Sequence, residues 1–497
     1  MIELAALAVA YAWAAIIVVR TLHVLQLESY VNRRLLRWMI GDPWRTVRFI
    51  VRPGGSAKKP LVLTGRAIRI FAVALGLLAV CFAAAVYGAV VLYGDPAAAL
   101  IAAAVLVPVS VMAVPVANWV LTPLQRVING RFLRAAAARL NEIKPIVIGI
   151  TGSYGKTSTK HFLQAMLSSK YRTLMTPGSY NTTMGVCRVI NEKLTPAHEV
   201  FIAEMGAYGR AEIKEIAGFV RPKVGILTAI GPQHLEWFRT VDNVVATKYE
   251  LIEALPAGGV ALFNADDPHC RELANRTQAA KVLRFGISTP PDMLDLRAEE
   301  ITHGRDGLSF MLVRRSGERA AVSTKLLGRH NVMNILAAAT AALELGVTLD
   351  AVAASIGRLE APAHRLQLVD AAGGVTVIDD AYNANPEGAA QALEVLSQFS
   401  GGRRILVTPG MVELGPLQDE ANRNFGRQAA AVCDYAILVG PRQTRPIRAG
   451  LSDVGFAADR VIGVPTLQGA TAALQRILQP GDIVLFENDL PDQYAEA

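Results

Sequence analysis

The sequence has little cysteine for its length. Its 497 residues include four cysteines, which are widely separated: Cys81, Cys187, Cys270 and Cys433. No two of them have the spacing of a metal-binding or redox-active pair, and their distribution does not indicate a disulfide framework. This argues against a small disulfide-stapled protein, and we expect reduced, buried thiols in a cytosolic body.

The chain also lacks a strong charge of one sign. Its formal net charge of +8 is modest for 497 residues, and arginines close to apolar segments account for much of it. This charge does not indicate nucleic-acid binding, so we expect no nucleic acid among the partners. The sequence contains no internal repeat and no low-complexity segment.

Apolar residues are in excess, and they are concentrated before residue 122. The hydrophobic fraction is 52% and the mean hydropathy is +0.32, both high for a soluble protein. Three apolar runs, 2–19, 70–93 and 97–121, each approach or exceed the ~20 residues that span a bilayer. We therefore expect an α-helical transmembrane region of three spans.

Two of these runs have an alternative interpretation. The first could be a cleaved signal peptide, but no basic residues precede it and further apolar runs follow. The third contains Pro108 and Pro115 and could be a buried core helix. Membrane helices tolerate proline, so a span is favoured there too.

Basic residues predict the orientation of the spans. The loop 20–69 has many basic residues and few acidic ones, and the positive-inside rule places such a loop in the cytoplasm. The basic residues are Arg33, Arg34, Arg37, Arg45, Arg48, Arg52, Lys58, Lys59, Arg66 and Arg69, against Glu28 and Asp42. The turn at 94–96 then lies outside, and the chain returns to the cytoplasm before Arg126, Arg131, Arg134 and Arg139. We expect a multi-pass protein of the cell (inner) membrane with cytoplasmic catalytic domains, whose basic residues could contact lipid headgroups.

From residue 145 onward, short apolar runs alternate with longer amphipathic stretches. This alternation predicts an α/β body with a parallel sheet. The first series of expected strands is 146–150, 199–205, 224–230 and 259–264. The second series, after a turn near 366–374, is 375–381, 404–410, 435–440 and 482–488. We expect 288–319 to form a β-rich flap, and the chain to divide into 1–124, 125–366 and 367–497.

A glycine-spaced turn follows the first expected strand, in the segment IVIGITGSYGKTSTKHF (146–162). Its glycines are three apart, at Gly149, Gly152 and Gly155, and Lys156 and Thr157 follow. Such a turn lets backbone N–H groups approach phosphate at the positive end of a helix. The lysine would neutralise phosphate charge and the threonine hydroxyl would face Mg²⁺. The alternative is a surface turn, because the glycines do not fit G-x-x-x-x-G-K-[ST].

Three further residues follow or lie near strand ends. Glu204 ends one expected strand, His234 follows another, and Lys248 lies early in an expected helix. Side chains at the carboxyl ends of parallel strands point toward the crevice where ligands bind. Taken singly, each is more often a solvated or packing residue than a ligand.

Two adjacent carboxylates stand at another expected strand end, in VIDDAYNANPEG (377–388). A polar turn follows them, and Pro386 marks the start of a helix. A plain strand-to-helix loop is the alternative, although paired carboxylates beside amides are unusual in a purely structural loop.

Together these segments resemble the Mur ligase family, the ATP-dependent amide ligases of peptidoglycan precursor synthesis. That family carries G-x-x-G-x-x-G-K-[ST] in place of the standard phosphate-loop pattern. Further matches are FNADD (263–267), GRHNVMNILAA (328–338), APAHRLQ (361–367), DDAYNANP (379–386) and MVELG (411–415). In APAHRLQ, Arg365 is kept but His364 replaces the family's glycine. The resemblance covers roughly residues 143 to 486 and is best for members that add D-alanyl-D-alanine.

The resemblance implies a central P-loop ATPase-like domain and a C-terminal Rossmann-like α/β domain. It implies a catalytic set of Lys156, Glu204, His234 and Lys248. It implies ATP binding by Gly152, Ser153, Gly155, Lys156, Thr157, Ser158, Asn334, Arg365 and Asp379. It implies substrate binding by Asn181, Thr182, Thr183, Asn383 and Asn385.

The resemblance also implies two Mg²⁺ ions. Thr157 and Glu204 would hold the first, and His234 with a CO₂-derived carbamate on Lys248 would hold the second. A carbamate turns a cation into an oxygen ligand suited to a hard metal. ATP would phosphorylate a substrate carboxylate, and an amine would attack the acyl phosphate.

Two segments depart from the family pattern. Membrane spans occupy the place of the small domain that grips the UDP part of the precursor. The family's C-terminal VKGSR-like stretch is replaced by LFENDLPDQY (485–494), where the amine is expected to be read. The identities of the carboxylate acceptor and of the incoming amine therefore stay open.

Three functions fit the sequence. The leading one is a membrane-anchored ligase that joins a D-alanyl-D-alanine-type dipeptide or amino acid to a UDP-linked or lipid-linked muramyl peptide. The second is another amide ligase of this kind, such as a poly-γ-glutamate synthetase. The third is a nucleotide-binding scaffold without activity that would meet other cell-wall synthesis proteins. We favour an enzyme, because a degenerate copy would be expected to have lost at least one of the catalytic and metal-binding residues. All five are present: Lys156, Thr157, Glu204, His234 and Lys248.

Overall fold

The computed structural model describes residues 2–41, 43, 46–47, 60–93, 96–278, 280–371, 373–382 and 384–490. Contacts between residues divide these into two units, Met1–Arg131 and Phe132–Leu490. Several expectations lie outside the described residues: Gly94 and Asp95 of the expected turn, much of the basic loop, Asn383 and the tail after Leu490.

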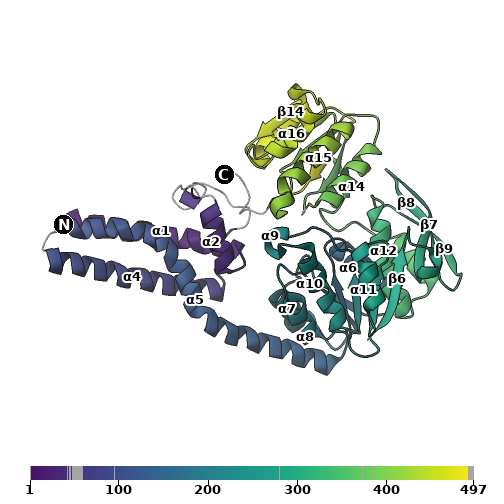
Figure 1. Ribbon diagram of the computed structural model, residues 1–497, viewed down its shortest axis with the longest axis horizontal. Helices are drawn as coiled ribbons and strands as arrows, with labels where there is room; N and C mark the ends of the chain where they lie inside the picture. The colour runs from purple at the N-terminus through teal and green to yellow at the C-terminus, as the bar shows by residue number, and fades with distance from the viewer. Residues whose placement is uncertain are drawn as a thin grey trace. The chain divides into compact units, whose positions relative to one another are not determined.

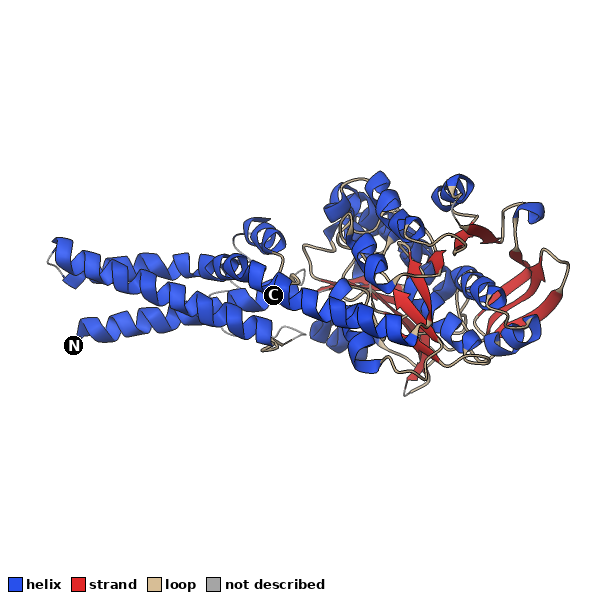
Figure 2. Ribbon diagram, turned by 90° about the horizontal axis from the view of Figure 1, so that it is seen from below, coloured by secondary structure: helices blue, strands red, loops and turns tan. Residues whose placement is uncertain are grey.

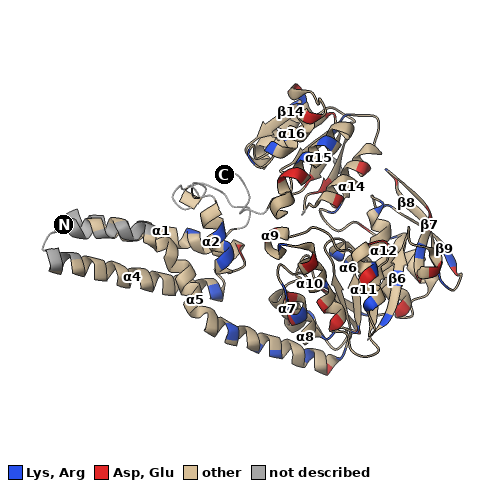
Figure 3. Ribbon diagram, in the orientation of Figure 1, with Lys and Arg blue, Asp and Glu red and all other residues tan. Residues whose placement is uncertain are grey.

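The first unit is helical. Its helices are α1 Ile2–Leu27, α2 Asn32–Gly41, α4 Gly65–Tyr93 and the first part of α5 Pro96–Ile143. Three stretches are long and apolar enough to cross a membrane: Leu7–Leu27, Gly65–Gly88 and Val109–Ile143. These overlap the three expected spans, and α5 continues through Pro108 and Pro115. Figure 3 shows basic segments in α2 and in the later part of α5, whereas most of α4 lacks charge.

Apolar side chains from α1, α2, α4 and α5 form the core of this unit, among them Leu22, Leu35, Ile70 and Val114. One buried amide joins three of the elements. The Asn118 Nδ2 atom donates to the backbone oxygen of Tyr30 at 3.0 Å and to Asn32 Oδ1 at 2.7 Å. Its Oδ1 accepts from Arg66 Nη2 at 3.2 Å, so the amide is satisfied.

The second unit contains two sheets, as expected of an α/β protein. Nine strands in the described part of the chain form the first, in the order β2-β3-β1-β4-β5-β6-β7-β8-β9. Strands β2 to β7 run parallel, and β7, β8 and β9 form an antiparallel meander in the region of the expected flap. The strands are β1 Ile146–Thr151, β2 Thr173–Met175, β3 Val200–Glu204, β4 Val224–Leu227, β5 Val260–Asn264, β6 Lys281–Gly286, β7 Leu296–Gly304, β8 Gly307–Arg314 and β9 Arg319–Thr324.

Helices cover both faces of this sheet (Figures 1 and 2). On one face Ile148, Ile202 and Leu262 pack against α6, α12 and α13. On the other, Phe201 and Phe263 pack against α7, α8, α10, α11 and the end of α5. The alternation follows from the two-residue period of a strand. The helices are α6 Lys156–Leu167, α7 Thr183–Lys193, α8 Glu212–Val220, α9 Leu235–Phe238, α10 Val241–Glu253, α11 Pro268–Arg276, α12 His330–Glu344 and α13 Leu349–Ile356.

The second sheet follows the order β10-β11-β15-β12-β13-β14, with only β10 antiparallel. Its strands are β10 Gln367–Ala371, β11 Val375–Asp380, β12 Arg404–Thr408, β13 Tyr435–Val439, β14 Val461–Val464 and β15 Ile483–Glu487. Helices α14 Pro386–Ser397, α15 Gln418–Val432 and α16 Arg445–Asp453 cover one face, and α17 Leu467–Ile477 covers the other. The two carboxylates of the DDAYNANP segment therefore end β11.

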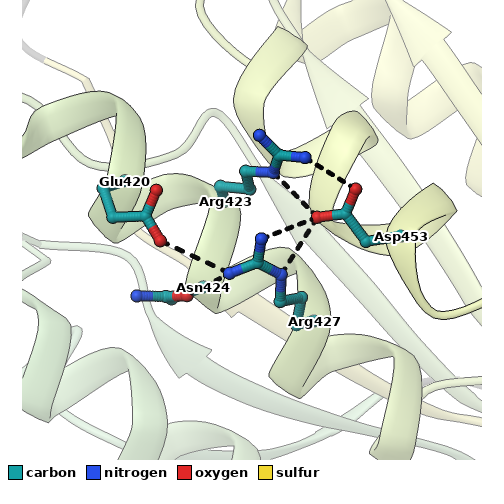
Figure 4. Close-up of polar contacts among 5 residues, drawn as sticks. All are labelled: Glu420, Arg423, Asn424, Arg427 and Asp453. Carbon is teal, nitrogen blue, oxygen red and sulfur yellow. Dashed lines mark hydrogen bonds and ion pairs between the residues drawn. The ribbon is translucent and has the colours of Figure 1, made fainter.

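Surface ion pairs join α15 to α16 (Figure 4). Arg423 donates twice to the Asp453 carboxylate, at 2.7 and 2.8 Å, and Arg427 Nε donates to it at 3.0 Å. The hydrogen bonds from Arg423 lower the pKa of Asp453 to about 2, so this contact is fully charged at neutral pH.

Replacing Phe263 by alanine should destabilise the second unit strongly. Its ring is fully buried in β5, and deleting a buried phenylalanine costs about 3–5 kcal/mol of unfolding free energy. Denaturant unfolding of the detergent-solubilised protein measures the loss. Leu467→Ala is the control, because that side chain is 46% exposed. Equal shifts for the two variants would contradict the assignment of Phe263 to the core.

Candidate active site

A cavity of about 530 Å³ lies in the second unit, where strands of both sheets end. Residues at or just after the ends of β1, β3, β4, β5, β11 and β15 line it. Ligands of open α/β sheets bind at the carboxyl ends of the strands. The cavity therefore lies where ligands are expected in this fold.

The glycine turn between β1 and α6 forms one wall of the cavity. Gly152 has φ +152°, and a Cβ there would overlap Thr228 Oγ1. Gly155 has φ +77° and precedes α6, and a Cβ there would overlap Asn334 Oδ1. Both positions therefore require glycine. The turn leaves backbone N–H groups at the α6 N-terminus free to face an anion.

The Lys156 side chain folds back over the glycine turn that precedes it. Its Nζ donates to the backbone oxygens of Gly152 at 2.7 Å and Ser153 at 3.1 Å. Burial lowers the pKa of Lys156 to about 8, with Glu204 opposing the shift and Arg365 adding to it. The ammonium is thus held where an incoming phosphate would meet it.

Glu204 ends β3, and both oxygens of its carboxylate accept hydrogen bonds. Its Oε2 accepts from Thr157 Oγ1 at 3.1 Å and from Lys160 Nζ at 2.8 Å, and its Oε1 accepts from Asn181 Nδ2 at 3.0 Å. Burial acts to raise the pKa of Glu204, but the charges of Lys160 and Lys156 outweigh it and the pKa lies below its usual value. The carboxylate is therefore ionised and fixed in position.

Lys160 is a site residue that the sequence analysis missed. Its side chain is fully buried, and besides Glu204 its Nζ contacts the backbone oxygen of Gly178 at 2.6 Å. The sequence contained a signal for Lys160. It lies one helical turn after Lys156 on an otherwise buried helix face, and a buried lysine requires a carboxylate partner.

His234 is paired with another residue that the sequence did not single out. Its Nδ1 lies 2.5 Å from Glu413 Oε2, and its ring packs at a tilt of 47° against the Tyr208 ring, with centroids 4.3 Å apart. Burial lowers the pKa of His234 despite the raising effect of Glu413. The second ring nitrogen of a neutral imidazole is available to a ligand. Glu413 lies within the MVELG segment, so that motif contained the missing partner.

Lys248 lies on α10 and is 2% exposed. Burial, with the charge of Lys156 second, lowers the pKa of Lys248 to about 7. Its Nζ lies 6.0 Å from the centroid of the Phe238 ring. Much of this amine is therefore neutral near pH 7, and a neutral amine is the form that reacts with CO₂.

Among the expected substrate residues, Asn181 and Asn385 line the cavity. Asn385 also caps α14 by accepting from Gly388 N at 2.9 Å. Thr182 caps α7, and Thr183 Oγ1 donates to Glu215 at 3.2 Å. Neither threonine is among the lining residues.

Among the expected nucleotide residues, Ser153, Gly155, Lys156, Thr157, Ser158, Asn334 and Arg365 line the cavity. The Arg365 guanidinium lies 4.3 Å from the centroid of the Tyr382 ring. Asn334 Nδ2 donates to Asn331 Oδ1 at 3.1 Å. These side chains leave planar and amide groups facing the cavity, which suits a purine base.

Asp379 and Asp380 lie differently with respect to the cavity. Asp379 does not line the cavity, because its carboxylate is paired with His364 Nδ1 at 2.7 Å. Asp380 does line it, with Oδ1 accepting from Leu366 N at 3.1 Å. His364 has φ +59°, a left-handed conformation that glycine adopts more readily, and it provides a partner for Asp379.

The donor set at Thr157 and Glu204 fits Mg²⁺. This ion keeps several waters and is usually held by one or two carboxylates together with substrate phosphates. No cluster of three or more His, Cys, Asp or Glu side chains occurs among the described residues, so a metal here depends on the nucleotide for further ligands.

Comparison with known proteins agrees with this geometry. The profile of the Mur ligase middle domain matches residues 150–342, and that of the Mur ligase, glutamate ligase domain matches residues 364–487. The UDP-N-acetylmuramoyl-tripeptide–D-alanyl-D-alanine ligase of Escherichia coli is 33% identical over 310 residues, covering 62% of this chain and 68% of that protein. The chain belongs to the Mur ligase family. As a Mur ligase it is an ATP-dependent carboxylate–amine ligase, and Mur ligases use Mg²⁺.

Further relatives agree. The enzyme of the same name from Bacillus subtilis is 27% identical, covering 71% of this chain and 75% of that protein. The crystal structure of MurF from Acinetobacter baumannii aligns with a TM-score of 0.65 and 27% identity, covering 74% of this Mur ligase and 78% of that chain. MurF from Thermotoga maritima, solved with ADP, shares the fold with a TM-score of 0.65 at 24% identity.

Gly155→Ala in this Mur ligase should abolish nucleotide binding while leaving the protein folded. The positive φ costs about 1–2 kcal/mol for any L-residue, and the new methyl would also overlap Asn334. Gly258→Ala is the matched control, because Gly258 has φ +78° with no atom within 4 Å of a Cβ. ATP affinity by calorimetry should fall only for the Gly155 variant. Equal affinity in both variants would contradict the close approach.

Proposed function

We propose that this Mur ligase joins a D-alanyl-D-alanine-type amine to a carboxylate of a muramyl peptide, with ATP as the energy source. The observation that carries the proposal is one cavity lined both by the phosphate turn with Lys156, Thr157 and Glu204 and by the ends of β11 and β15. The names of its relatives support the choice of substrates.

The reaction proceeds in two steps. The acceptor carboxylate attacks the γ-phosphorus of ATP, forming an acyl phosphate and releasing ADP. The amine then attacks the acyl carbon, the tetrahedral intermediate collapses, phosphate leaves and the amine nitrogen loses a proton. Lys156 and the α6 N-terminus stabilise negative charge on the transferring phosphoryl group. Thr157 and Glu204 would hold Mg²⁺, which would add charge neutralisation.

Lys248 is proposed to carry a carbamate, and His234 to present its free ring nitrogen beside it. The lowered pKa of Lys248 supports this, because only the neutral amine attacks CO₂. The carbamate would supply the oxygen ligands that a second Mg²⁺ requires. The pairing with Glu413 fixes the His234 ring, as an outer partner does for ligating histidines.

The helical unit is proposed to anchor the enzyme at the cell membrane with its catalytic part in the cytoplasm. Three helices long and apolar enough to cross a bilayer support this, as does the basic loop 20–69. The proposed division is an anchor over 1–124, a nucleotide-binding domain over 125–366 and a C-terminal domain over 367–497. An enzyme held at the membrane can meet an acceptor linked to lipid as well as one linked to UDP.

Phosphate release from the detergent-solubilised protein tests the proposed reaction. The acceptors are UDP-linked and lipid-linked muramyl tripeptides, each with and without D-alanyl-D-alanine. We expect release that depends on both substrates and disappears in Lys156→Ala, because that variant loses the charge that faces the phosphates. Turnover retained by Lys156→Ala, or no release with any acceptor, would refute the proposal.

Replacing Lys248 by alanine should reduce the rate, and short carboxylic acids should partly restore it. The wild-type protein incubated with ¹³C-bicarbonate should show a carbamate carbon by NMR that the variant lacks. Lys281→Ala is the control, because its side chain is 57% exposed. A wild-type spectrum without a carbamate signal would count against the modification.

A further inference from the structure

Glu487 is a buried acid with an oxygen that has no partner. It ends β15, is 1% exposed and lines the cavity. Its Oε2 lies 3.4 Å from Thr408 Oγ1, whereas its Oε1 has no hydrogen-bond partner. A buried polar atom without a partner costs folding free energy, so its persistence facing a cavity indicates a ligand there.

A second carboxyl lies beside it. Asp380 on β11 is the register partner of Glu487 on β15, so the two side chains leave neighbouring parallel strands, about 5 Å apart, on the same face. Both line the cavity. Burial raises the pKa of Asp380 to about 6 and that of Glu487 well above its usual value, and the charge of Asp380 adds to the shift of Glu487. The pair thus retains a proton at neutral pH unless another cation replaces it.

The backbone after Glu487 is fixed. Asn488 has φ +68°, and its side chain donates to Gly410 O at 2.6 Å and accepts from Ala384 N at 3.2 Å. Glycine and asparagine are the residues that adopt this left-handed conformation readily. Asn488 therefore holds the chain in this turn directly after Glu487, which fixes the position of the Glu487 carboxyl in the cavity wall.

An organic cation suits this pair better than a metal. Neither carboxyl belongs to a group of three or more His, Cys, Asp or Glu side chains in the described part of the chain. An ammonium has three N–H donors, and the free Oε1 of Glu487, the second carboxyl and the Thr408 hydroxyl offer acceptors. Arg365 lowers the pKa of Asp380 by its charge, but its guanidinium lies over the Tyr382 ring.

We propose that Glu487, together with Asp380, binds the ammonium group of the incoming amine substrate. This inference rests on the proposed function and identifies the residues that recognise the amine substrate of that reaction. Binding releases to solvent the proton that the pair held. The amine enters the cavity as a cation, at the wall formed by β11 and β15, while the phosphates occupy the turn at Lys156.

Steady-state kinetics of the full-length protein in detergent test the inference. Glu487→Gln keeps the size of the side chain but removes its charge, and we expect the KM for D-alanyl-D-alanine to rise about 10- to 100-fold, the range for a hydrogen bond to a charged group. The KM for ATP should stay unchanged. Glu420→Gln is the matched control, because Glu420 is an exposed acid of the same sheet's helical layer, paired with Arg427.

An N-acetylated dipeptide, which lacks the ammonium group but keeps the carboxylate, separates recognition of the ammonium charge from a structural effect. It should inhibit wild type and Glu487→Gln equally. Glu487→Lys should raise the amine KM further than Glu487→Gln does.

Trapping of the acyl phosphate with hydroxylamine, in the absence of amine, reports the first step alone. If trapping is intact and either Glu487 variant keeps the wild-type amine KM, the inference fails and the ligase function stands. If wild type forms no acyl phosphate, the proposed function itself fails.

Discussion

The buried ion pair between Lys160 and Glu204 is the interaction on which the site depends. Both side chains are inaccessible to solvent, so each would carry a large desolvation cost without the other. The remaining lone pairs and protons are satisfied by Thr157, Asn181 and the backbone of Gly178. These groups come from α6, from the end of β3 and from the loop that enters α7. Displacing any of them would leave a buried charge uncompensated, so the pair fixes the three segments relative to one another.

The same ion pair explains how two lysines of α6, Lys156 and Lys160, have different roles. Lys156 and Lys160 are four residues apart and so lie on one side of α6. Lys160 neutralises Glu204 from within the protein, whereas Lys156 contacts only backbone oxygens of its own turn. Lys156 can therefore form an ion pair with a phosphate while Glu204 stays paired with Lys160. A single lysine could not neutralise Glu204 and a phosphate separately.

The sequence predicted the local features well because they depend on periodicity and on turn chemistry. The strands that end at Glu204 and Asp380 were located to within one residue, and the glycine turn was located from its spacing. Features that depend on distant pairs were missed. Glu413 meets His234 across 179 positions, and His364 takes Asp379 away from the cavity. The helix that contains the third expected span continues beyond 121 to Ile143, where Leu140 packs in the core of the second unit.

The cavity is electrically polar, and its polarity matches the two reactants. Lys156, at the N-terminus of α6, makes one wall positive, whereas Asp380 and Glu487 make the wall of the second sheet acidic. Arg365 lies within electrostatic range of both, since it lowers the pKa of Lys156 and that of Asp380. A nucleotide and a phosphorylated carboxylate are anions, and an incoming amine is a cation. In a low-dielectric cavity this difference in electrostatic potential between the two walls favours anions at one wall and cations at the other more strongly than it would in water. In the proposed reaction the two sheets therefore contribute different halves, and the order of charge across the cavity would orient the amine toward the acyl group.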